Sequence, residues 1–268
     1  MTSRRHALAL LGAGSLGLAL RPLPSLGGGF LQTRDRQAGS LLSGALDGKG
    51  FWDGSSTKTY TGQLYDEVRL KALESGYLAM VTGEGGQDFQ AEAVVRTIFE
   101  HMDRLPEVED GAMAVVRLGT GTDAFNGLPY VDSFYYLDFT LFYGTYGQRM
   151  YKRIDGDRTV LYFEKLTPEI AGAAWSGYRA KMDQAAAAVD RRALFNTVRE
   201  VSEIFGMFVV SPGSQRSTRV TFTTRVHFGE DSGLVARMGS EMPAVIKAGL
   251  RSGFDSCVAI ARKVQAGG

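Results

Sequence analysis

The middle of the chain is a succession of strand-like segments, and no other feature constrains the fold as much. These segments are rich in Val, Tyr, Phe and Thr, which favour β-strands, and they cover residues 113–118, 131–146, 148–154 and 159–166. Turn residues such as Asp155-Gly156-Asp157 separate consecutive segments. Because short turns join antiparallel neighbours, the sequence predicts an antiparallel meander.

Shorter segments flank this meander. An apolar spacing near that of a helix runs from Leu64 to Leu73, a strand is expected at 77–82, and an amphipathic helix is expected at 91–102. An Ala-rich stretch within 167–195 is expected to be helical. Two more strands are expected at about 200–210 and 216–228, and the second alternates apolar and polar residues.

A long helix is expected to close the chain from residue 240 to residue 264, with Ser240 as its N-cap and Pro243 in its first turn. Gly249 and Gly253 lie inside it, and each costs about 1 kcal/mol relative to Ala. Either close packing of the helix on the sheet compensates, or the glycines leave room for a ligand. The expected apolar face consists of Met242, Ile246, Leu250, Gly253, Cys257, Ile260 and Val264.

Composition bounds the class of protein. The 268 residues are 44% hydrophobic and 22% charged, as in one globular domain with a small appendage. A formal net charge of +1 gives no reason to expect a nucleic acid as the main partner. The single cysteine, Cys257, excludes an internal disulfide.

The N-terminus has the pattern of an export signal. Ser3-Arg4-Arg5 precedes an uncharged run from His6 to Leu20, similar to a twin-arginine signal, and this run is shorter than the roughly 20 residues of a spanning helix. We therefore expect residues 1–27 to be removed and the protein to work in a bacterial periplasm. The remainder divides into a flexible lead-in, residues 28–62, and a ligand-binding domain, residues 63–268.

The order of elements carries a resemblance to a known superfamily. The resemblance rests on four segments: AEAVVRTIFEHMDRLPEVEDGAMAVVRL at 91–118, LYFEKL at 161–166, TRVTFTTRVHF at 218–228 and the terminal helix. Over about residues 75–265 the chain resembles the START and polyketide-cyclase superfamily, often called SRPBCC. The resemblance implies an α+β helix-grip fold, in which a curved antiparallel sheet wraps around a long C-terminal helix with an internal hydrophobic cavity. The helical stretch at 167–195 departs from the simplest version of this fold.

No catalytic or metal-binding motif stands in the chain. HExxH, GxSxG and cysteine clusters are absent, and beyond the signal the histidines are His101 and His227. Gly119-Thr120-Gly121 and the glycine-rich residues 83–86 are expected to be turns rather than phosphate loops. We therefore expect no catalytic residue, no metal and no cofactor.

Aromatic residues crowd the segment from Ser133 to Gly147. They form either a packed sheet face or the wall of a cavity that holds an apolar ligand. Three polar residues, Asp138, Glu164 and Arg225, could orient a head group. The candidate ligand-binding residues are Tyr136, Asp138, Phe139, Tyr143, Glu164, Trp175, Phe205, Met207, Phe208, Phe222, Arg225, Met242, Ile246, Gly249 and Gly253.

The function that these features predict is binding or transfer of a hydrophobic small molecule such as a lipid, sterol, isoprenoid or quinone. Burying roughly 300 Å² of apolar ligand contributes on the order of 7 kcal/mol before the costs of binding. The expected partner is this molecule, with a transient membrane contact and no nucleic acid. Two alternatives remain: a cyclase or hydratase with carboxylate or tyrosine acid–base chemistry in the same cavity, and a cell-envelope interaction module with the aromatic strand as its docking surface.

Overall fold

The computed structural model describes residues 31–48, 50–59, 65–85, 91–139, 141–191, 196–213, 217–229, 233 and 242–266. The predicted signal at 1–27 and the predicted N-cap Ser240 lie outside these residues.

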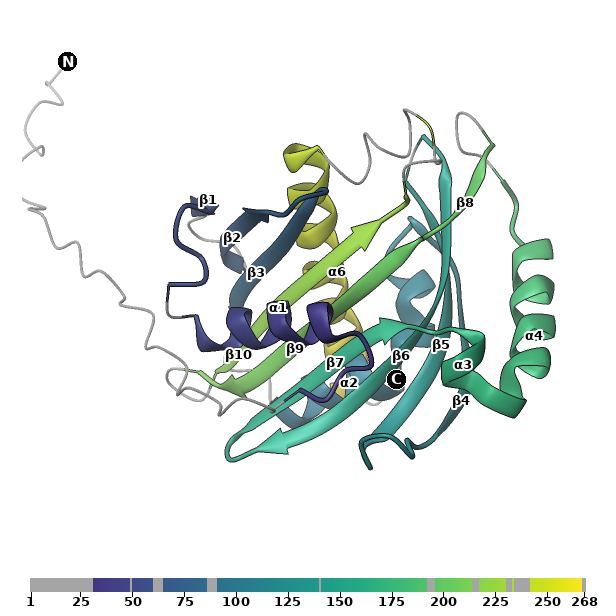
Figure 1. The fold of residues 1–268 in the computed structure, drawn as a ribbon, viewed down its shortest axis with the longest axis horizontal. Coiled ribbons are helices and arrows are strands. Elements are labelled where there is room, and N and C mark those ends of the chain that lie inside the picture. The colour runs from purple at the N-terminus through teal and green to yellow at the C-terminus, as the bar shows by residue number, and fades with distance from the viewer. Residues whose placement is uncertain are drawn as a thin grey trace, which may run out of the picture.

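Ten strands in the described part of the chain form one curved sheet (Figure 1). Their order across the sheet is β1-β2-β3-β10-β9-β7-β6-β5-β4, with antiparallel neighbours throughout, and β8 pairs in parallel with β6. The strands are β1 Ser56–Thr59, β2 Tyr65–Ala72, β3 Tyr77–Gly85, β4 Ala112–Thr122, β5 Pro129–Asp138, β6 Tyr143–Asp155, β7 Arg158–Lys165, β8 Val198–Glu200, β9 Glu203–Pro212 and β10 Thr218–His227.

Helices cover both faces of the sheet. They are α1 Arg36–Asp47, α2 Ala91–Glu100, η1 Met102–Glu107, α3 Pro168–Ala171, η2 Gly172–Ala174, α4 Trp175–Ala187 and α6 Pro243–Gln265, where η marks a 3₁₀-helix. Helices α2, η1 and α6 pack on what we call the inner face of the sheet, whereas α1 and α4 pack on the outer face. In Figure 1, α1 lies in front of the sheet and α6 lies behind it.

The predicted antiparallel meander is confirmed as β4 to β7. Gly156, with φ +60°, forms the β6–β7 turn at the expected Asp155-Gly156-Asp157 signal. The segment expected as one strand from 131 to 146 is two strands, because the chain turns where the Phe139 N–H donates to the Phe142 carbonyl at 2.9 Å. Aromatic residues lie on both sides of this turn, and because they favour strands, propensity alone predicted one continuous strand.

The helical spacing at 64–73 was a wrong prediction, since residues 65–72 form strand β2. Val68 and Leu70 are both buried in the inner core, two residues apart, while Arg69 and Lys71 between them are half-buried. This period of two is the pattern of a strand, and pairing with β1 and β3 provides the backbone hydrogen bonds.

The lead-in predicted as flexible contains a helix that packs on the sheet. Asp35 caps α1 by accepting from the backbone N–H groups of Gln37 and Ala38, at 2.8 and 3.2 Å. Leu42 and Leu46 are fully buried against the outer face. The flexible interpretation is therefore wrong for these residues, because an apolar stripe four residues apart is enough to anchor a short helix to a sheet.

The closing helix is confirmed as α6, with Pro243 in its first turn and Met242 as the N-cap residue. Its C-terminal half is the more buried, through Phe254, Cys257, Val258 and Ala261. The expected helical content of 167–195 is also confirmed, as α3, η2 and α4.

Candidate functional site

A small cavity lies on the inner face, between the α2–η1 region and strands β4, β5 and β6. Its volume is about 10 Å³, which is room for about one water molecule. The sequence led us to expect an internal cavity large enough for an apolar ligand, and this cavity is too small to hold one. The lining residues are Ile98, Phe99, Met102, Asp103, Arg117, Val131, Ser133, Tyr135, Gln148 and Met150.

Two polar side chains in this lining face each other across the β5–β6 pair. Ser133 and Gln148 are direct register partners, and they are 8% and 5% exposed. The next pair along the same face, Tyr135 and Tyr146, is stacked with ring centroids 4.9 Å apart. The Gln148 side chain hydrogen-bonds the Tyr135 hydroxyl, and burial raises the pKa of that hydroxyl well above its ordinary value.

Most of the inner face is hydrocarbon. Phe208 and Phe222 stack at 4.3 Å, and Phe139 meets Phe228 edge-on at 5.5 Å. Phe222, Val226 and Ile246 pack against this core but remain partly exposed. The inner face is therefore an apolar surface whose sealing by helix α6 is incomplete.

The two glycines of α6 do not serve close packing. Among the residues that the structure describes, no heavy atom lies within 4 Å of a methyl group added at Gly249 or Gly253. Gly249 is exposed, whereas Gly253 is half-buried. Of the two explanations for these glycines, close packing on the sheet is wrong, and unfilled space remains beside Gly253.

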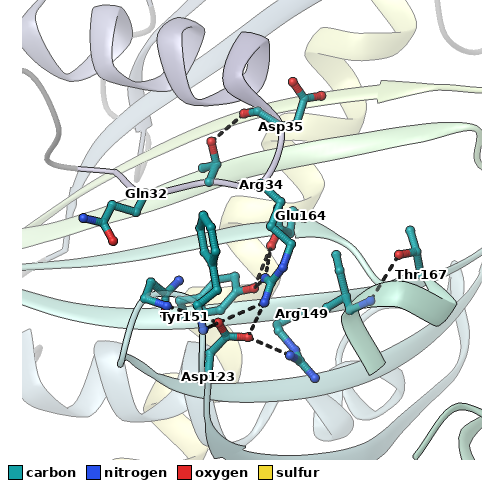
Figure 2. Close-up of polar contacts among 12 residues, drawn as sticks. Gln32, Arg34, Asp35, Asp123, Arg149, Tyr151, Glu164 and Thr167 are labelled. Carbon is teal, nitrogen blue, oxygen red and sulfur yellow. Dashed lines mark hydrogen bonds and ion pairs between the residues drawn. The ribbon is translucent and has the colours of Figure 1, made fainter. Parts of the chain in front are cut away.

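A network of buried charges lies on the outer face, beneath the segment that leads into α1 (Figure 2). Arg34 Nη2 donates to both carboxylate oxygens of Asp123, at 2.9 and 2.8 Å, and Arg34 Nη1 donates to Glu164 Oε1 at 3.0 Å. The Tyr151 hydroxyl donates to the same Glu164 oxygen at 2.6 Å. Asp123 also accepts from the Phe125 N–H at 2.9 Å, which shapes the turn between β4 and β5.

Arg149 extends this network to another acid. Its Nε and Nη2 donate to the two oxygens of Asp132, both at 2.7 Å, and its Nη1 donates to Asp123 Oδ2 at 2.8 Å. The Tyr130 ring lies over this guanidinium, with 3.7 Å between Cζ and the ring centroid. Two guanidinium groups thus bind the three carboxylates of Asp123, Asp132 and Glu164, and loss of either guanidinium would leave buried acids without a cation.

The carboxylates of this network respond differently to their surroundings. Burial by itself would raise the pKa of Asp123, but hydrogen bonds from Arg34, the Phe125 N–H and Arg149 outweigh burial and lower this pKa. Burial dominates at Asp132, whose pKa is raised despite Arg149. Burial also raises the pKa of Tyr178, a hydrogen-bond partner of Asp132, to about 12. Asp132 is therefore protonated before Asp123 as the pH falls.

The structure divides the candidate ligand-binding residues between the two faces. Phe139, Phe208, Phe222 and Ile246 belong to the inner core. The expectation of one common wall is wrong for the residues that pack on the outer face, which are Tyr136, Tyr143, Glu164, Trp175, Phe205 and Met207. Strand alternation places Asp138 and Arg225 on the outer face too, and Arg225 binds Glu203 at 2.6 Å. Met242 is 41% exposed, ahead of α6.

Sequence reasoning missed the cavity pair, Ser133 and Gln148, and the cation Arg34. Ser133 and Gln148 had a weak signal, since both are polar residues in a row of aromatic and apolar strand positions. Helix α1 did have a local signal: a capping residue, Asp35, precedes an apolar stripe at helical spacing, formed by Ala38, Leu42, Ala45 and Leu46. Nothing local indicated the partners of Arg34, which lie 89 to 130 residues further along the chain.

Other functional signals are few in the described part of the chain. It contains no group of three or more His, Cys, Asp or Glu residues placed to hold a metal ion. His227 Nε2 lies 3.4 Å from Ser75 Oγ, at the edge of hydrogen bonding. None of the helices described has the length and hydropathy needed to cross a bilayer. Burial raises the pKa of the Cys257 thiol to about 12, so this thiol is a poor nucleophile.

Comparison with known proteins identifies the fold. No protein-family model and no curated protein matches this sequence. Among solved structures, human StAR-related lipid transfer protein 5 is similar with a TM-score of 0.53 and 7% identity, covering 85% of this chain and 96% of that one. Human STARD10 is similar with a TM-score of 0.51 and 12% identity, covering 88% and 84%. From its own topology and these likenesses, the chain has the START-like helix-grip fold, a curved antiparallel sheet with a long C-terminal helix on its inner face.

Proposed function

We propose that this protein binds a hydrophobic small molecule, such as a lipid, sterol, isoprenoid or quinone, between the inner face of the sheet and helix α6. The observation that carries the proposal is the incomplete apolar seal of this face. Phe222, Val226 and Ile246 remain partly exposed, and the half-buried Gly253 has open space beside it. Covering such a surface with an apolar ligand is favourable at about 25 cal/mol per Å².

The ligand must enlarge the space that is present. A cavity of about 10 Å³ holds one small group, so side chains on the inner face have to move when an apolar molecule enters. Methionines suit this adjustment because their side chains are unbranched and flexible, and Met102 and Met150 both line the cavity. The lipid-transfer function in the name of human StAR-related lipid transfer protein 5 is consistent with this proposal.

The two alternatives have less support. An enzyme that uses Glu164 would need this carboxylate in the inner space, but Glu164 lies on the outer face with Arg34 and Tyr151. A docking surface made by the aromatic strand would need exposed rings, but Tyr135, Tyr136 and Tyr143 are buried. Neither arrangement favours a second function.

We place this binding in a bacterial periplasm, after removal of residues 1–27. The supporting observation is the sequence itself, with Ser3-Arg4-Arg5 ahead of the uncharged run. Fractionation of cells that express the full chain, followed by intact-mass measurement, tests this location. We expect a periplasmic protein shortened near residue 27, and a full-length cytoplasmic protein would refute the proposed location.

Ligand binding is tested by native mass spectrometry and solvent extraction of the protein purified without detergent after expression of the full chain. We expect a co-purifying apolar molecule. Gly253→Leu fills the open space beside α6 and should reduce occupancy at least about tenfold, because the added side chain takes up the volume that the ligand would need. Gly177→Leu is the matched control, since Gly177 is a helical glycine with open space in α4, on the outer side. Equal occupancy in the two variants would contradict the proposed site.

A further inference from the structure

We infer that the cavity beneath η1 is the polar end of the ligand site and that it accepts one uncharged oxygen, a hydroxyl or a carbonyl, of an otherwise apolar molecule. The inference rests on the proposed function, because it assumes that an apolar ligand occupies the inner face. It adds the chemical class of that ligand.

The first observation is the polar pair inside an apolar row. Along the inner face of β5 and β6, the register pairs Val131 with Met150, Ser133 with Gln148 and Tyr135 with Tyr146. Burying polar side chains among apolar neighbours costs free energy unless they make hydrogen bonds. A Gln amide can make up to four hydrogen bonds, so one to Tyr135 leaves capacity for a ligand.

The second observation is the size of the cavity. About 10 Å³ accommodates one water-sized group. A hydroxyl or a carbonyl oxygen fits this volume, whereas a phosphate or a carboxylate with its hydration shell does not. The hydroxyl of Ser133 and the amide of Gln148 can each both donate and accept, so they suit either oxygen.

The third observation is the balance of charge. The charged residues in the lining are Asp103 and Arg117, which form an ion pair at 3.5 Å and are 44% and 39% exposed in their side chains. This pair is already neutral, so it leaves no net charge to compensate an ionised head group in the cavity. The remaining lining side chains, Ile98, Phe99, Met102, Val131 and Met150, suit the apolar part of the ligand next to its oxygen.

The test uses three probes with one apolar chain: dodecan-1-ol, dodecanoate and dodecane. Each is titrated against the protein, and displacement of the fluorescent apolar reporter N-phenyl-1-naphthylamine is measured. We expect dodecan-1-ol to displace the reporter at about five- to tenfold lower concentration than dodecane, because its hydroxyl gains one or two hydrogen bonds in the cavity. Dodecanoate should show no such advantage.

Two variants locate the effect. Gln148→Leu and Ser133→Ala should each reduce the advantage of dodecan-1-ol over dodecane to less than about twofold. Thr223→Val is the control, because Thr223 is a fully buried polar strand residue on the outer face, and it should preserve the advantage. Circular dichroism checks folding, and Gln148→Met replaces Gln148→Leu if the latter does not fold.

The outcomes separate the inference from the proposed function. Reporter binding without an advantage for the alcohol, or with an advantage that persists in the variants, overturns the inference and leaves hydrophobic binding intact. A preference for dodecanoate that Arg117→Ala abolishes also overturns it, in favour of a carboxylate site. Failure of the reporter and all three probes to bind refutes the proposed function, and the inference falls with it.

Discussion

The two faces of the sheet are sealed by different chemistry. On the outer face, Arg34 and Arg149 bind buried carboxylates, and α1 lies above them. On the inner face, α2, η1 and α6 cover a mostly apolar surface that includes the polar pair Ser133 and Gln148 and a small cavity. Opening the outer face would leave buried charges unpaired, which is costly. Opening the inner face loses individually weak apolar contacts that a ligand can replace, so the inner face is the one suited to binding.

The largest effect is expected from Arg149→Met. It leaves Asp132 and Asp123 buried without the guanidinium that they share, and this should lower the free energy of unfolding by about 4 kcal/mol. Urea denaturation measures the change. Arg179→Met is the control, because Arg179 forms an exposed ion pair with Asp183 and its loss should cost less than about 0.5 kcal/mol. Similar losses in both variants would show that the buried network contributes little.

Arg34→Ala should have the next largest effect, about 3 kcal/mol, since Arg34 also pairs with two buried acids but is 29% exposed in its side chain. Its loss should also free the segment ahead of α1, so limited proteolysis should cut there first. Arg36→Ala makes the same charge change at an exposed position of α1 and should leave stability within about 0.5 kcal/mol of wild type. Unchanged proteolysis of Arg34→Ala would mean that apolar contacts of α1 suffice to hold it.

Acid should weaken the outer face through Asp123. Its pKa in the folded protein lies below the ordinary value of 3.8, so its stabilising contribution is present above pH 3.8 and is lost as the pH falls through the lower, folded-state pKa. The difference in unfolding free energy between wild type and Asp123→Asn should be about 2 kcal/mol at pH 6 and smaller at pH 3. Asp183→Asn, at an exposed position, should show a small difference at both pH values. A pH-independent difference for Asp123→Asn would contradict this assignment.

The smallest effect is expected on the inner side, from Gly249→Ala. A methyl group at this exposed helical position meets no heavy atom of the described part of the chain within 4 Å, so the variant should gain about 0.5 to 1 kcal/mol from helix propensity alone. Thermal unfolding should show a higher midpoint. A loss of stability would mean that the space beside α6 is less open than the structure shows.

Much of the fold was accessible from sequence, and little of the site was. The meander, α2 and α6 were predicted because their patterns are local and long. Strand β2 was misread because Leu64 and Val68 lie four residues apart and Leu70 and Leu73 lie three apart, as in a helix. The turn at 139–142 and helix α1 were missed because aromatic strand residues masked the turn, and the glycine and serine clusters of 28–62 suggested a flexible segment. Of the candidate ligand-binding residues, Phe208, Phe222 and Ile246 lie together in the inner core, whereas Ser133 and Gln148 of the cavity were not singled out.

The sequence by itself determined the antiparallel meander and helices α2 and α6, since periods of two and of about 3.6 residues are properties of consecutive positions. Only the tertiary structure decided which face each side chain occupies. Phe205 and Phe208 belong to one strand and point to opposite cores. Glu164 binds Arg34, 130 residues away, because the register of the sheet and the docking of α1 bring them together. Register and docking depend on contacts between distant segments, and no local pattern encodes them.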